Sequence, residues 1–239
     1  SMFMFAKLRT KKSNDEIKLI EKAVSIAEKS LNSIINTLNT GISEKDFASQ
    51  LVMELLKNGS ESELPFSPIV ASGTNGANPH HFPTDKIIGD NELVIIDWGA
   101  NCQGYFSDIT RTFATGKNID SKLLDAFESV KLANSAARAE SAHGVTAGDV
   151  DLAARSIIDQ RGFGDYFIHR TGHGLGLEIH EEPNIKQNEG FVLTKGNIYT
   201  IEPGIYIPEL GGIRIEDDVL IESSGARSLT TIPRGLVYL

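Results

Sequence analysis

Apolar residues recur at helical spacing in two segments near the start of the chain. Ser13 followed three residues later by Glu16 forms a capping box, and the apolar spacing predicts a helix from there to about Thr37. Ser43 is a second cap, and Gly59 ends the helix that follows it. The apolar positions of this second helix are Phe47, Leu51, Leu55 and Leu56.

The pattern changes from residue 65 onward, where short apolar runs are broken by Gly, Pro and Asn. Such runs are typical of strands and loops. We expect strands at 93–98, 105–113, 198–202, 205–207 and 213–221, and further helices at about 121–142 and 147–160. Helices followed by strands, twice over, predict an α+β fold of two similar halves. Because no linker or low-complexity stretch divides the chain, one domain over residues 1–239 is expected.

Composition and charge narrow the class of protein. The net charge of -9 argues against nucleic acid as a partner, since a phosphate backbone needs clustered Lys and Arg. No apolar run reaches membrane-spanning length, and the apolar residues at the start are too few for a signal peptide. Cys102 is the single cysteine, so no internal disulfide forms. We therefore expect a soluble cytoplasmic protein.

Carboxylates stand inside two predicted strands that otherwise contain apolar residues. Asp97 ends one apolar run, and Asp108 lies within the next strand. A turn centred on Cys102 and Gln103 would place these aspartates opposite each other, with Cβ atoms roughly 4.5–5.5 Å apart. One aspartate alone could cap a strand or face solvent, but an opposed pair among apolar neighbours fits that interpretation poorly. A cation between the two would convert their repulsion into attraction.

The same pattern returns with Glu202 and Glu216. A turn centred on Glu209 would pair them, although two prolines between Glu202 and Glu209 leave this register open. The two aspartates that follow Glu216 complicate the alternation, because one of them must face the other way. We take Glu216 as the inward residue because it shares the parity of Arg214, a natural partner for an acidic site.

His173 and His180 lie in a Gly-rich segment, residues 171–183. A lone histidine is more often a surface or core residue than a ligand, and two in one such segment leave both interpretations open. Alternating glycines also occur in dinucleotide-binding loops. No helix of suitable spacing follows, however, and the two glutamates after His180 would repel phosphate, so we reject that alternative.

Four carboxylates and one imidazole form the candidate ligand set. A structural zinc takes four ligands, so this set is too large for one. Oxygen-rich ligation with one nitrogen suits manganese or cobalt, and bridging carboxylates suit a pair of ions. Two ions roughly 3.5–4 Å apart can activate one bridging water and hold the attacked carbonyl. The set therefore predicts a hydrolase.

Seven stretches of the chain resemble the prolidase and aminopeptidase P group. They are residues 69–73 (IVASG), 79–80 (PH), 96–100 (IDWGA), 107–113 (SDITRTF), 169–183, 202–206 (EPGIY) and 214–218 (RIEDD). The resemblance covers most of the chain in the order of that group. It implies the pita-bread fold, with two αβ halves around a dinuclear metal centre, and hydrolysis of Xaa-Pro bonds in dipeptides or short peptides. Full-length members usually carry an additional N-terminal domain, whereas this chain begins almost at the catalytic domain.

The resemblance also implies a role for each matching residue. Asp97 would hold the first metal alone, Asp108 and Glu216 would bridge the two ions, and His173 and Glu202 would complete the shell of the second. The expected ions are two divalent metals, with manganese first and cobalt or zinc as alternatives.

Four further residues, three on the substrate side and one behind the metal ligands, take roles by the same resemblance. His80 would assist at the substrate carbonyl, and His180 would stabilise the tetrahedral intermediate. His169 would help form the proline pocket, and Arg214 would brace the metal ligands. His81, beside His80, is expected to be a bystander.

Three rival functions remain at this stage. They are a methionine aminopeptidase-like enzyme, a scaffold protein that lost catalysis, and a metal-free hydrolase similar to creatinase. The intact ligand set favours the metallopeptidase over the last two, because a decayed site would be expected to lose a costly buried carboxylate. The expected partners are a peptide substrate and a second copy in a homodimer.

Overall fold

The computed structural model describes residues 8–38 and 41–239. The stretch searched for a signal peptide lies mostly outside the described residues. Within them, no helix is long and apolar enough to cross a membrane.

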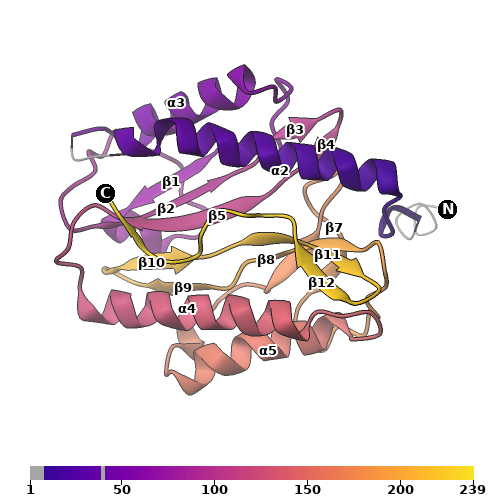
Figure 1. The fold of residues 1–239 in the computed structure, drawn as a ribbon. Coiled ribbons are helices and arrows are strands. Elements are labelled where there is room, and N and C mark those ends of the chain that lie inside the picture. The colour runs from indigo at the N-terminus through magenta and orange to yellow at the C-terminus, as the bar shows by residue number, and fades with distance from the viewer. Residues whose placement is uncertain (1–7, 39–40) are drawn as a thin grey trace.

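Helices cover the strands on two opposite sides (Figure 1). On one side lie α2 (Asn14–Ile34), continued by the short 3-10 helix η1 (Ile35–Thr37), and α3 (Glu44–Lys57). On the other side lie α4 (Ser121–Glu140) and α5 (Ala147–Gln160). The capping box at Ser13 and Glu16 is present, and Ser43 caps α3 as predicted. These helices confirm the predicted order of elements.

Two sheets lie between the helix pairs. The first has the order β1-β2-β5-β13, and its strands are β1 (Ile69–Ser72), β2 (Leu93–Trp98), β5 (Ile109–Ala114) and β13 (Val237–Tyr238). The second has the order β12-β11-β8-β6-β7, and its strands are β12 (Gly225–Ser228), β11 (Asp217–Glu222), β8 (Ile198–Ile201), β6 (Gly172–Gly174) and β7 (Glu181–Ile185). Two short hairpins pair β3 (Asn101–Cys102) with β4 (Tyr105–Phe106), and β9 (Gly204–Ile207) with β10 (Gly211–Arg214).

Each half of the molecule has its own hydrophobic core. The first packs α2 and α3 on the first sheet and includes the fully buried Trp98, whose indole N–H donates to the carbonyl of Ala27 at 2.9 Å. The second packs α4 and α5 on the second sheet and includes Phe127 and Tyr199. Glu216 lies at the junction, where its backbone N–H donates to the carbonyl of Thr110 in β5. The cores flank the strand ends that carry the acidic residues, and the α+β prediction is confirmed.

The predicted register of Asp97 and Asp108 is wrong. Asp97 pairs with Thr110, and Cys102 pairs with Tyr105, so the turn is centred one residue later than expected. The two turn residues, Gln103 and Gly104, have φ angles of 53° and 83°. A two-residue hairpin turn of this kind needs positive φ at both positions, which glycine adopts without strain, and this requirement fixes the centre.

Asp108 instead lies in a break between β4 and β5, so the single strand predicted over 105–113 is two strands. The break frees the Asp108 side chain from the alternation of the ladder. Its backbone N–H donates to Oδ2 of Asp218 at 3.1 Å.

The predicted turn at Glu209 is confirmed. Glu209 has a φ of 63°, and the pairs Gly211 with Ile207 and Asp217 with Ile201 are both symmetric about it. The strand predicted over 213–221 is divided into β10 and β11. Glu202 and Glu216 lie between the two ladders and at equal distance in sequence from the turn, as predicted.

Candidate functional site

One cavity of about 360 Å³ collects all nine residues that the sequence singled out. They are His80, Asp97, Asp108, His169, His173, His180, Glu202, Arg214 and Glu216. The first sheet and the loops beside it contribute the first three, and the second half of the molecule contributes the rest. Residues more than a hundred positions apart therefore meet at the junction of the two halves.

The acidic residues meet around the imidazole of His173. Its Nε2 lies 3.6 Å from Oδ2 of Asp108 and 3.2 Å from Oε1 of Glu202. Ligand atoms of Asp108, His173 and Glu216 all lie within 4.8 Å of one another, and all three residues are buried. This trio is a geometrically suitable metal site.

Asp97 lies at the edge of this cluster and faces Arg214. Its Oδ2 accepts a hydrogen bond from Nη2 of Arg214 at 2.7 Å. Its Oδ1 is buried and has no hydrogen-bond partner among the described residues. An orphaned carboxylate oxygen beside the trio is a vacant acceptor that a cation would satisfy.

The pKa values of the cluster reflect crowded negative charge. Burial raises the pKa of Asp108 well above its usual value, and the charges of Glu216 and Asp97 raise it further. Burial likewise raises the pKa of Glu216, with Glu202 and Asp97 as the next causes. Burial opposes ionisation of Glu202 too, but the hydrogen bond and charge of His173 outweigh it and lower that pKa to about 2. A divalent cation would let all the carboxylates ionise together, so the donor set fits divalent metal.

Two histidines of the cavity, His169 and His180, have lowered pKa values. The rings of His173 and His180 meet edge to face, with centroids 4.3 Å apart. Partial burial lowers the pKa of His180 to about 4, with the neighbouring His173 and Arg170 as the next causes. Burial also lowers the pKa of His169. Both imidazoles are therefore uncharged at neutral pH.

Tyr206 links two of the predicted residues. Its hydroxyl accepts from Nη1 of Arg214 and lies 2.8 Å from Nε2 of His169. Because Nδ1 of His169 faces the carbonyl of Arg170 at 2.7 Å, that nitrogen carries a proton, and Nε2 can accept from the tyrosine. The sequence analysis marked Tyr206 only as the last residue of the motif EPGIY.

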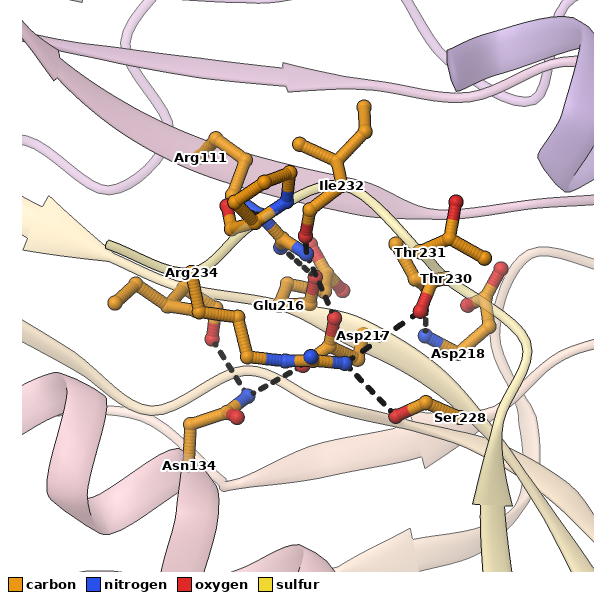
Figure 2. Close-up of polar contacts among 12 residues, drawn as sticks. Arg111, Asn134, Glu216, Asp217, Asp218, Ser228, Thr230, Thr231, Ile232 and Arg234 are labelled. Carbon is orange, nitrogen blue, oxygen red and sulfur yellow. Dashed lines mark hydrogen bonds and ion pairs between the residues drawn. The ribbon is translucent and has the colours of Figure 1, made fainter. Parts of the chain in front are cut away.

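The two aspartates after Glu216 have different partners. Asp218 accepts from the backbone N–H of Asp108, whereas Asp217 lies among the polar side chains drawn in Figure 2. Asp217 is fully buried and accepts from Arg111 at 2.8 Å and from Arg234 at 2.7 Å. Arg111 also donates to the backbone carbonyl of Glu216. Alternation alone did not decide which way these aspartates face. In the structure, Asp217 and the arginines that it binds fix the segment that carries Glu216.

The comparisons with known proteins identify the family. The sequence profile of metallopeptidase family M24 matches residues 18–223. The chain belongs to this family. An Xaa-Pro dipeptidase of Pyrococcus furiosus is 45% identical over 230 residues, which are 96% of this chain and 66% of that protein.

Solved structures of M24 relatives share the fold. The Xaa-Pro dipeptidase from Bacillus anthracis superimposes with a TM-score of 0.96 at 39% identity, covering 98% of this chain and 66% of that one. The prolidase from Pyrococcus furiosus gives 0.93 at 44% identity, covering 96% and 68%. These likenesses confirm the predicted pita-bread architecture. The chain spans 62 to 66% of the length of the curated relatives it matches first.

Proposed function

We propose that this chain is the catalytic part of a metal-dependent peptidase that hydrolyses the Xaa-Pro bond of dipeptides or short peptides. One observation carries the proposal: the five predicted ligands surround one cavity together with three substrate-side histidines. The family, and relatives named as Xaa-Pro dipeptidases, support the same activity. Membership of family M24 supports peptidase activity in general, and the preference for proline is the more specific part of the proposal.

Asp97, Asp108, His173, Glu202 and Glu216 would hold two divalent ions, of which we propose manganese. When bound, such a pair supplies an activated water and polarises the attacked carbonyl. We further propose that the chain is one catalytic domain and that it works in the cytoplasm, which its single buried Cys102 supports.

The residues around the ligands orient the substrate. His180, neutral and at the cavity rim, donates a hydrogen bond to the oxygen that gains charge during attack. His80 faces the same space from the opposite half and holds the substrate carbonyl. His169 and Tyr206, joined by their hydrogen bond, form the wall against which the proline ring packs.

Proline specificity follows from the chemistry of the bond. A peptide bond before proline has no N–H, so a site made for it needs no acceptor there. A secondary amide would bring an unpaired N–H into that site at a cost of roughly 1–3 kcal/mol.

The test compares matched dipeptides. With manganese, Ala-Pro and Met-Pro should be cleaved at least about tenfold more efficiently than Ala-Ala and Met-Ala, and a chelator should abolish all four rates. Metal analysis of Asp108→Ala should show reduced occupancy, since that residue belongs to the buried trio. Equal rates on the Pro and Ala members would refute proline specificity, and preference for Met-Ala would favour the methionine aminopeptidase alternative.

A further inference from the structure

A fully buried carboxylate outside the metal cluster, Glu44, sits in the first turn of α3. Its Oε1 accepts from the backbone and the hydroxyl of Ser72, each at 2.8 Å, and from the side chain of Asn75 at 3.0 Å. Its Oε2 accepts from the backbone and hydroxyl of Thr84 and lies 2.9 Å from Nε2 of His81. Burial opposes ionisation, yet these donors outweigh it and lower the pKa of Glu44 to about 2. The carboxylate is thus anionic and saturated with donors.

These donors come from both ends of one segment. Ser72 ends β1, and Thr84 closes the His80 loop, which we define as residues 78–84. The backbone N–H groups at the start of α3 add to this attachment, because those of Glu44 and Lys45 donate to the carbonyls of Lys86 and Thr84 at 3.0 Å. A helix start whose free N–H groups bind a loop holds that loop firmly.

The imidazole of His80 has no comparable attachment. The residue is exposed, lines the cavity, and has no side-chain hydrogen bond among the described residues. Its backbone N–H donates a hydrogen bond to Oδ1 of Asn78 at 3.0 Å. The position of the ring is therefore set by the backbone of the loop. The adjacent His81, whose side chain is 11% exposed, anchors that backbone to Glu44.

We propose that Glu44 and His81 are positioning residues that hold the His80 imidazole over the cavity. This rests on the proposed function, in which His80 holds the substrate carbonyl. Neither residue touches the metal ligands in the contacts described above. The two neighbouring histidines thus have different roles, since His80 contacts the substrate and His81 fixes the loop. In this proposal His81 anchors the loop, in place of the bystander role expected from the sequence.

The first experiment replaces the anchor. In His81→Leu the donor to Glu44 is lost, whereas in His81→Gln an amide N–H remains near the position of Nε2. Because a displacement of about 1 Å can cost up to about 10²-fold, we expect kcat on Ala-Pro to fall at least about tenfold in His81→Leu. Metal content should stay unchanged. His81→Gln should recover most of the rate, and Glu44→Gln should behave like His81→Leu if it folds.

A double-mutant cycle separates positioning from general damage. If His81 acts through His80, adding His81→Leu to His80→Ala should lower kcat little further, because the group being positioned is already absent. Adding His81→Leu to His180→Ala should multiply the two losses. Asp149→Asn is the matched control. Asp149 is also a carboxylate in the first turn of a helix, but among the described residues its side chain binds only the cap residue Thr146. This variant should leave kcat unchanged.

Hydrogen exchange provides a readout that does not need activity. Amides of residues 78–84, including the Thr84 N–H that donates to Glu44, should exchange faster in His81→Leu and not in Asp149→Asn. Wild-type protein that cleaves no Xaa-Pro peptide would refute the proposed function, and loop exchange would still decide the anchoring. Unchanged exchange in His81→Leu, or losses that multiply with His80→Ala, would overturn the positioning role.

Discussion

The two loops that carry cavity histidines are held in place by different chemistry. The His80 loop is tied to one buried carboxylate, that of Glu44, by the backbone N–H and hydroxyl of Thr84 and by His81. The His180 loop, which we define as residues 176–182, is tied to the start of the chain by charge. Glu181 pairs with Lys12 and with Arg9, and the Lys12 side chain is only 1% exposed.

This difference predicts how much stability is lost when one contact of each loop is removed. Glu44 keeps most of its donors when a single one is removed, so its loop should weaken by degrees. Lys12 is a buried cation, and burial lowers its pKa while the charge and hydrogen bond of Glu181 oppose that change. Removing its partner leaves a buried charge uncompensated, which costs much more than losing one neutral hydrogen bond.

The largest expected effect comes from breaking the ion pair. Glu181→Gln should lower the free energy of unfolding by about 3 kcal/mol, measured by urea denaturation at pH 7. His81→Leu should lower it by only about 1 kcal/mol, since Glu44 retains its other donors. The double variant Lys12→Met with Glu181→Gln should recover part of the loss. If Glu181→Gln costs no more than His81→Leu, the two loops are not held differently.

The next largest effect is expected when His180 itself is removed from the His180 loop. His180→Ala should lower kcat roughly 10²-fold, the scale of losing one donor to the transition state. Metal content and melting temperature should change little, because His180 is exposed and is not one of the proposed ligands. A variant that unfolds or loses metal would instead show that His180 is structural or a ligand.

The smallest expected effect is a change in stability with pH that depends on the ionisation of Glu44. Its folded pKa of about 2 lies below the ordinary value of 4.5, so its ionised form stabilises the fold fully above pH 4.5. This stabilisation is lost as the pH falls toward 2. Between pH 7 and pH 4 the loss amounts to about 1 kcal/mol of the free energy of unfolding. In metal-free protein, the stability difference between wild type and Glu44→Gln should shrink by this amount. A constant difference would mean that the Glu44 pKa is ordinary.

Sequence reasoning succeeded where the turn residues restricted the register. Glu209 before the glycines at 211 and 212 gave the correct centre, about which the ladders on both sides are symmetric. It failed by one residue at Gln103, because apolar alternation does not reveal which two residues adopt positive φ. The short strands β6 and β13 were missed because strands of two or three residues have no measurable periodicity.

The cavity residues were found because carboxylates and histidines stood in apolar or Gly-rich surroundings and matched known motifs. Glu44 and Lys12 carried no such mark. An acidic residue in the first turn of a helix ordinarily faces solvent and favours the helix dipole, so nothing local distinguishes a buried one. Their partners, Ser72 and Glu181, are 28 and 169 positions away, and only the folded chain brings them together.

The position of Trp98 has an optical consequence. It is the single tryptophan of the chain, it directly follows Asp97, and its indole is fully buried against the carbonyl of Ala27. All tryptophan emission therefore originates from one ring, shielded from water and one residue from the cavity. In the native state its emission spectrum reports on the surroundings of the end of β2. When the first core opens, the spectrum shifts to that of a solvated indole, so the same fluorophore also follows unfolding without a label.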